Sequence, residues 1–139
     1  MRHSEAMTSI ARLRPEGLVR SPAFSHVAVV PPGATTIYVG GQNAVTADGT
    51  LVGEGDVAAQ SVRALQNATT ALAAAGATLR DVVQWTVLFV EGADLAAAYG
   101  AIAGELASDE PALVTSAMVA GLAVPGALVE IAAVAAVVR

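Results

Sequence analysis

The chain has 139 residues, of which 55% are apolar and 14% charged, with a formal net charge of −5. This length suits one domain, and an apolar share larger than a small monomer can hide predicts self-association. The absence of lysine and cysteine, together with only two histidines, leaves no basic stripe for nucleic acid and argues against a metal site.

The N-terminal stretch, residues 1–20, is polar, mixed and without periodicity, and we interpret it as a tail that precedes a single domain at 21–139. No apolar run lies between its arginines, so this stretch does not resemble a secretory signal. No apolar run reaches the roughly 18 to 20 residues that a membrane-spanning helix needs. We therefore expect a cytoplasmic protein without a membrane segment.

Two strands are predicted at the start of the domain. Residues alternate from Phe24 to Val30, and β-branched and aromatic residues fill Thr35–Val39. The turn cluster 31–33, Pro-Pro-Gly, lies between them, so we expect the two strands to pair as a hairpin.

The glycine pair Gly40-Gly41 directly follows the second strand. Paired glycines there indicate either a close approach of main chain to a ligand or a bulge without one. Asp48-Gly49 predicts a further hairpin turn.

The middle of the chain predicts two helices and two strands. Asp56 and Asp94 are expected to cap helices that extend to about residues 75 and 107. Residues 82–90 and 114–120 are predicted to be strands. The outer face of the first strand carries both polar and apolar residues, which suits a contact between subunits. The order ββ(β)αβαββ predicts an α+β fold, with both helices on one face of a mixed sheet.

The last predicted strand carries one unexpected charge. From Ala127 to Val138 the run is almost wholly apolar, which predicts a strand buried on both faces, yet Glu130 lies inside it. A carboxylate removed from water must be paired, face a water-filled cleft or be protonated. Each of these suits a functional site, whereas the alternative is a rim residue with its carboxylate in solvent.

Several separated motifs resemble the Rid family, the reactive intermediate deaminases. They are YVGGQ (38–42), DVAAQ (56–60) with ALQN, AAGATLRDVVQWTVLFV (74–90) and PGALVEIAAVA (125–135), within a similarity that covers about residues 20–137. The resemblance implies a chorismate-mutase-like α+β fold and a homotrimer with ligand clefts between subunits. It also implies cofactor-independent hydrolysis of enamines and imines to a carbonyl compound and ammonia.

The same resemblance assigns site residues. Glu130 matches the cleft glutamate and is the candidate catalytic residue, and Gly41 matches a glycine whose main chain contacts the ligand. Val114 stands where the family has its carboxylate-binding arginine, so the cation is missing. Phe24 replaces a tyrosine and Tyr99 an asparagine.

Two further positions complete the predicted ligand site. Ser116 falls at a position that is cysteine in some members of the family, and His26 shares a strand face with Phe24. His26, or Arg20 just upstream, could supply the missing cation; the alternative is a surface histidine and a solvated arginine.

Three functions follow in order of preference. The first is a divergent deaminase for a neutral or weakly acidic imine, because Val114 leaves no arginine at the position where the family binds the carboxylate of a 2-imino acid. The second is a catalytically inactive trimer that binds or senses a small molecule. Ribonuclease activity comes last, because the chain is acidic and lacks lysine.

Overall fold

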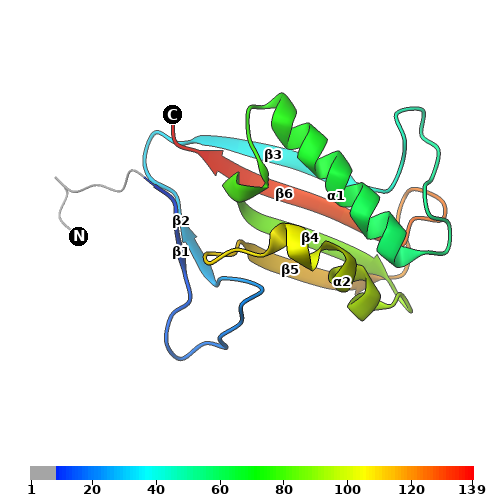
Figure 1. Ribbon diagram of the computed structural model, residues 1–139, viewed down its shortest axis with the longest axis horizontal. Coiled ribbons are helices and arrows are strands. Elements are labelled where there is room, and N and C mark those ends of the chain that lie inside the picture. Colours follow the sequence, from blue (N-terminus) through cyan, green and yellow to red (C-terminus); the bar gives the residue numbers. More distant parts are fainter. Residues whose placement is uncertain (1–8) are drawn as a thin grey trace.

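A computed structural model describes residues 9–139. Its centre is a four-stranded mixed sheet in the order β3-β6-β4-β5 (Figure 1). The strands are β3 (Thr35–Gln42), β6 (Val129–Val137), β4 (Val82–Val90) and β5 (Leu113–Val119). The β4–β5 pair is parallel, whereas β6 runs antiparallel to both of its neighbours.

Two helices lie on one face of this sheet, which confirms the predicted α+β arrangement (Figure 1). They are α1 (Val57–Ala74) and α2 (Leu95–Leu106). Asp56 and Asp94 cap them as predicted, each accepting a hydrogen bond at 3.0 Å from the main-chain N–H three residues further on. Neither helix, nor any other within residues 9–139, is long and apolar enough to cross a membrane.

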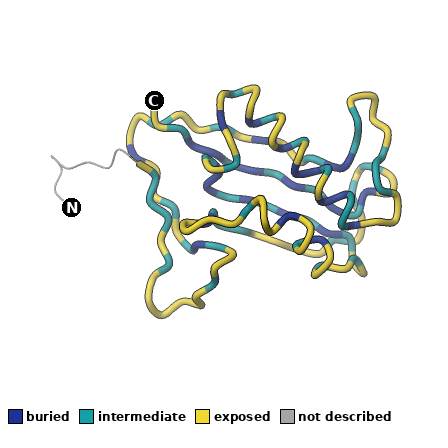
Figure 2. Tube along the Cα trace, in the orientation of Figure 1, coloured by how far each residue is buried: buried dark blue, intermediate teal, exposed yellow. Residues whose placement is uncertain are grey.

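The core lies between the helices and the sheet. Along β4, Trp85, Val87 and Phe89 are buried, and along β6 the buried side chains begin with Val129 and Ile131. Residues between them are only half-buried, as the alternating colours in Figure 2 show. The prediction that β6 is buried on both faces is therefore wrong for a single chain, because the helices cover only one face.

A second, two-stranded sheet lies beside the main one. It pairs β1 (Ala11–Leu13) with β2 (Val27–Val29) in antiparallel fashion. The predicted hairpin between β2 and β3 is thus wrong, because β3 instead pairs with the nine-residue strand β6. Alternation along a sequence identifies the faces of a strand but does not identify its partner. The first eight residues of the predicted tail lie outside the described part of the chain.

Candidate functional site

Glu130 and Gly41 lie against one another. Glu130 is half-buried on β6, opposite Leu88 of β4, and its neighbours Val129 and Ile131 face the core. Its side chain therefore projects from the face that the helices leave uncovered. Gly41 lies where β3 shifts register, and a Cβ built on it would be 2.6 Å from the Glu130 Cδ. In this chain the group that comes close to the Gly41 main chain is the Glu130 side chain.

A buried glutamine fixes the main chain that leads to Glu130. Gln60 of α1 is wholly buried, and its Nε2 donates to the carbonyls of Gly53 (3.1 Å) and Gly126 (3.2 Å). Its Oε1 accepts from the N–H of Leu128 at 2.8 Å. One side chain thus holds the loop before α1 and the start of β6 together.

Two asparagines fix the loop that follows Gly41. The Nδ2 of Asn43 donates to the carbonyl of Val129 at 3.0 Å, and Asn67 of α1 donates to the carbonyls of Asn43 and Val45 at 2.9 Å each. Main chain on both sides of the Gly41–Glu130 contact is therefore held by buried or half-buried amides. Gln60 and Asn67 lie in the DVAAQ and ALQN motifs, but their roles were not predicted from the sequence.

Tyr99, Ser116 and Val114 form a second group on the opposite side of the sheet. The Tyr99 hydroxyl, from α2, donates to the Ser116 Oγ of β5 at 2.9 Å. The Tyr99 ring meets Phe89 edge to face, with centroids 5.3 Å apart. Val114 lies beside Trp85 in the β4–β5 ladder and packs against the core. This group thus belongs to the face that the helices cover.

The two groups cannot share a pocket within one chain, because the sheet lies between them. Glu130 and Gly41 are on the uncovered face, whereas Tyr99, Val114 and Ser116 are on the covered one. A site that uses both groups requires a second copy of the chain.

Comparison with known proteins identifies the family of this chain. The sequence profile described as Endoribonuclease L-PSP matches residues 18–137. The chain belongs to the Rid family. No curated protein sequence matches it, but solved structures of this family do.

A Yersinia pestis Rid-family protein of unknown function, YyfB, is 32% identical, with a TM-score of 0.79 and coverage of 91% of this chain and 97% of that one. Rv2704 of Mycobacterium tuberculosis, from the YjgF/YER057c/UK114 family, is 27% identical over 93% of this chain and 100% of that one, with a TM-score of 0.61. A putative endoribonuclease of Thermotoga maritima is 25% identical over 89% and 91%, with a TM-score of 0.66.

The other predicted ligand residues of this Rid chain lie near the start of β5. The rings of Phe24 and His26 meet edge to face at 5.4 Å, and the N–H of Ser25 between them donates to the Ala112 carbonyl at 3.2 Å. The Nε2 of His26 lies 2.6 Å from the Val19 carbonyl oxygen, which can only accept a hydrogen bond, so Nε2 is the donor. Arg20 is exposed. Nothing in these contacts directs His26 or Arg20 toward Glu130.

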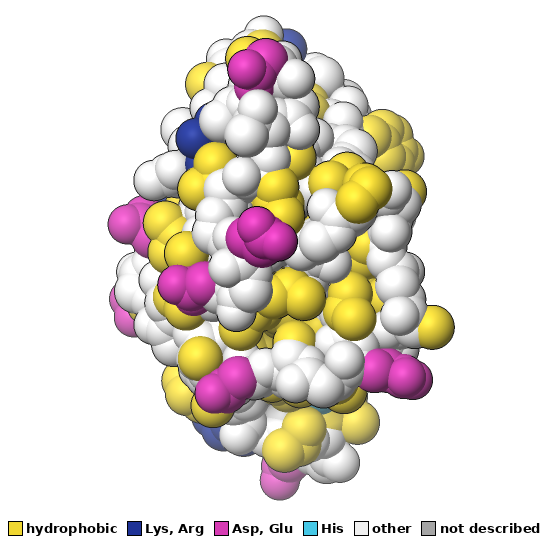
Figure 3. Space-filling view, turned by 90° about the vertical axis from the view of Figure 1, so that its right-hand side faces the viewer, with side chains coloured by type: hydrophobic (Ala, Val, Ile, Leu, Met, Phe, Trp, Pro, Cys, Tyr) yellow, Lys and Arg dark blue, Asp and Glu magenta, His cyan; other side chains and the backbone are white. Residues whose placement is uncertain are grey.

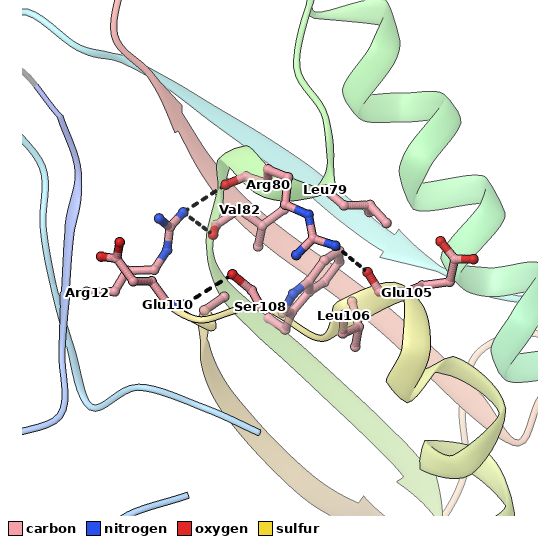
Figure 4. A pocket seen from close by; sticks show the side chains of 10 residues that line it. Arg12, Leu79, Arg80, Val82, Glu105, Leu106, Ser108 and Glu110 are labelled. Carbon is pink, nitrogen blue, oxygen red and sulfur yellow. Dashed lines mark hydrogen bonds between the residues drawn. The ribbon is translucent and has the colours of Figure 1, made fainter. Parts of the chain in front are cut away.

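Two arginines that were not predicted as site residues line a cavity near Val114. Arg12 of β1 and Arg80 share this cavity with Trp85, the ladder partner of Val114 (Figure 4). No pattern in the sequence relates the two arginines, because they are 68 residues apart. Within residues 9–139, no cluster of histidine and carboxylate side chains is arranged to hold a metal ion.

Proposed function

We propose that this Rid-family chain forms a homotrimer that hydrolyses a small imine or enamine without a cofactor, in clefts between subunits. The observation that carries the proposal is the placement of Glu130. It is the only ionisable side chain of β6, it lies on the uncovered sheet face, and its neighbouring main chain is fixed by Gln60 and Asn43.

The reaction needs one water and one group that can move a proton. Water adds to the imine carbon to give a carbinolamine, which releases ammonia and leaves a carbonyl compound; an enamine first takes a proton on carbon to become the imine. A carboxylate within hydrogen-bonding reach can accept the proton of the attacking water and return it to the departing nitrogen. Glu130 is assigned this role.

Subunit assembly supplies the second half of the site. Tyr99 and Ser116 present hydroxyls on the covered side of one chain, while Glu130 and Gly41 lie on the uncovered side. Cyclic symmetry places one side of each subunit against the other side of its neighbour. The uncovered face also retains exposed apolar side chains such as Tyr38, which is 79% exposed. Burial of this face against another copy would remove that area from water.

The substrate is proposed to be neutral or weakly acidic. Val114 contributes only apolar surface beside Trp85, so a carboxylate desolvated there would have no bidentate partner. A 2-imino acid such as that from 2-aminoacrylate would therefore bind weakly.

A trimer that binds a small molecule without turning it over is the second candidate. It is favoured by the same residue, Val114, and by Phe24, whose ring packs on His26 and offers no hydroxyl. Ribonuclease activity is disfavoured by charge. On the molecular end shown in Figure 3, acidic side chains are spread over the surface and basic ones appear only near its edges.

Release of ammonia tests the proposal directly. Purified protein is added to freshly generated 2-aminoacrylate and, separately, to a neutral imine, with Glu130→Ala and Glu91→Ala compared with the wild type. Glu91 is an exposed glutamate in the loop after β4 and serves as the matched control.

We expect the wild type and Glu91→Ala to accelerate hydrolysis of the neutral imine, and Glu130→Ala to lose about 100-fold or more of that acceleration. Full activity in Glu130→Ala would exclude its catalytic role. No acceleration of either substrate, together with saturable binding of a small molecule, would support the binding trimer instead.

A further inference from the structure

A cavity of about 200 Å³ opens at the end of the sheet where β4 and β5 begin (Figure 4). Arg12 enters it from β1, and Arg80 enters it from the short 3-10 helix η2 (Leu79–Asp81). Trp85 forms part of its wall, and Ser108 adds a hydroxyl from the segment between α2 and β5. None of the residues assigned above to imine hydrolysis lines this cavity, so the inference is independent of that proposal.

Main-chain carbonyl groups hold both guanidinium groups in place. The Nη2 of Arg12 donates to the carbonyls of Arg80 (3.0 Å) and Val82 (2.8 Å). The Nη1 of Arg80 donates to the carbonyl of Ala107, just past the end of α2, at 2.7 Å. These carbonyls are neutral acceptors, so they orient the two positive charges without cancelling them.

One donor of Arg12 has no acceptor. Its Nε is buried, and no group within residues 9–139 accepts a hydrogen bond from it. An unpaired buried donor costs stability, and a charged one costs more than a neutral one. The side chain that carries this donor lines the cavity, so an anion bound there would lie beside an incompletely paired positive charge.

We infer that this cavity binds a small monovalent carboxylate through Arg12 and Arg80. Carboxylate oxygens are the acceptors that guanidinium groups pair with most strongly. The volume greatly exceeds the roughly 10–15 Å³ that one water requires, so a few-carbon acid fits. Glu105 and Glu110 also line the cavity and balance the two arginines in formal charge. They disfavour a multivalent anion such as phosphate.

Titration with propionate tests this inference through the arginine side chains themselves. The Nε–H resonances of the intact, ¹⁵N-labelled protein are followed by NMR as sodium propionate is added at constant ionic strength. Propionamide, which has nearly the same shape but no charge, and sodium chloride are the comparison solutes. Arg12→Gln and Arg14→Gln are titrated in parallel. Arg14 is the matched control, because it also donates to a carbonyl, that of Asp109, but does not line the cavity.

We expect propionate alone to shift the Arg12 Nε–H resonance saturably. Arg12→Gln should weaken binding at least about tenfold, and Arg14→Gln should leave it unchanged. If Arg12→Gln does not fold, Arg12→Lys is used instead. It keeps the positive charge but lacks the planar guanidinium group, so it should also weaken binding. The inference is overturned if the Arg12 Nε–H does not shift saturably, or if Arg14→Gln weakens binding as much as the Arg12 variants. In either case the two arginines serve only to hold β1 and α2 in place.

Discussion

The carboxylate of Glu130 occupies the space that any side chain on residue 41 would need. A Cβ on Gly41 would lie 2.6 Å from the Glu130 Cδ and 2.7 Å from its Oε2, well inside normal contact distances. The glycine and the glutamate are therefore coupled. The position of the proposed catalytic carboxylate depends on the absence of a side chain 89 residues earlier in the chain (130 minus 41).

Gly41→Ala should reduce activity far more than stability. The alanine methyl group would displace the end of the Glu130 side chain, which is flexible and can move at small energetic cost. We expect hydrolysis of the neutral imine to fall at least about tenfold. The free energy of unfolding should change by no more than about 1 kcal/mol. Steady-state kinetics and urea denaturation at a fixed protein concentration measure the two effects.

Gly40→Ala is the matched control for this prediction. A Cβ on Gly40 meets nothing within 4 Å, and the residue is the immediate neighbour of Gly41. Its activity should remain within about twofold of the wild type, because a surface substitution without new contacts is close to neutral. Equal losses in the two variants would show that the bulge itself, rather than the position of Glu130, sets the rate.

Subunit mixing should restore activity if the site spans two chains. Glu130→Gln removes the group on the uncovered face, and the double variant Tyr99→Phe, Ser116→Ala removes the hydroxyls on the covered side. Both variants should be nearly inactive alone. After they are unfolded and refolded together in equal amounts, about one interface in four should combine two intact halves. Ammonia release should then reach roughly a quarter of the wild-type rate.

The subunit-mixing experiment would give the opposite result if the site lay within one chain. If each chain carried a complete site, combined refolding would only average the two inactive proteins, and no activity would return. Each variant refolded by itself is the control for losses during refolding. Size-exclusion chromatography must show the same oligomer in all samples, because trimer formation is itself part of the proposal.

Local chemistry in the sequence was sufficient to predict the helices and most of the sheet. Asp56 and Asp94 each precede an apolar periodicity, and both cap helices as expected. The strand predicted at residues 82–90 has the same bounds as β4. These features depend on residues within a few positions of one another, so they can be predicted from a single sequence.

Features that depend on distant residues were not predictable. The partner of β2 is β1 rather than β3, because a three-residue strand carries too little pattern to select its neighbour. Arg12 and Arg80 meet only through the placement of β1 beside η2. The separation of Glu130 from Tyr99 by the sheet follows from strand order, which alternation does not encode.

Gln60→Leu should destabilise the protein strongly. The substitution leaves the carbonyl of Gly126 and the N–H of Leu128 without a partner, both close to a fully buried side chain. The carbonyl of Gly53 keeps the N–H of Asp56 as a donor. At about 1–3 kcal/mol for each of the two unsatisfied groups, the loss should be about 2 kcal/mol or more. Urea denaturation at a fixed protein concentration measures it.

Gln66→Leu is the control on the same helix. Gln66 is exposed, and its replacement should alter the free energy of unfolding by less than about 0.5 kcal/mol. If Gln60→Leu proved as stable as Gln66→Leu, water or a shift of the loop would have to satisfy the Gly126 carbonyl and the Leu128 N–H. The assigned role of Gln60 in fixing the start of β6 would then be wrong.

The turn at Asp48 should show a small acid sensitivity that depends on Thr46. The hydroxyl of Thr46 donates to the Asp48 carboxylate, and Thr50 adds a weaker contribution, so the pKa of Asp48 lies below its ordinary value. Because the pKa of Asp48 is lower in the folded state than its unfolded value of about 3.9, the ionised carboxylate stabilises the folded state at pH values above 3.9. This stabilisation is lost as the pH falls through the folded pKa. Because the carboxylate is wholly exposed, solvent screening keeps the effect small.

Thr46→Val tests this by removing the hydroxyl without changing the shape of the side chain. We expect the pKa of Asp48, followed by the carboxyl ¹³C resonance, to rise toward its ordinary value while staying below it, because the Thr50 N–H still donates. Thr70→Val, on the exposed face of α1, should leave the pKa of Asp48 unchanged. An unshifted Asp48 in Thr46→Val would mean that the Thr50 contacts alone determine its titration.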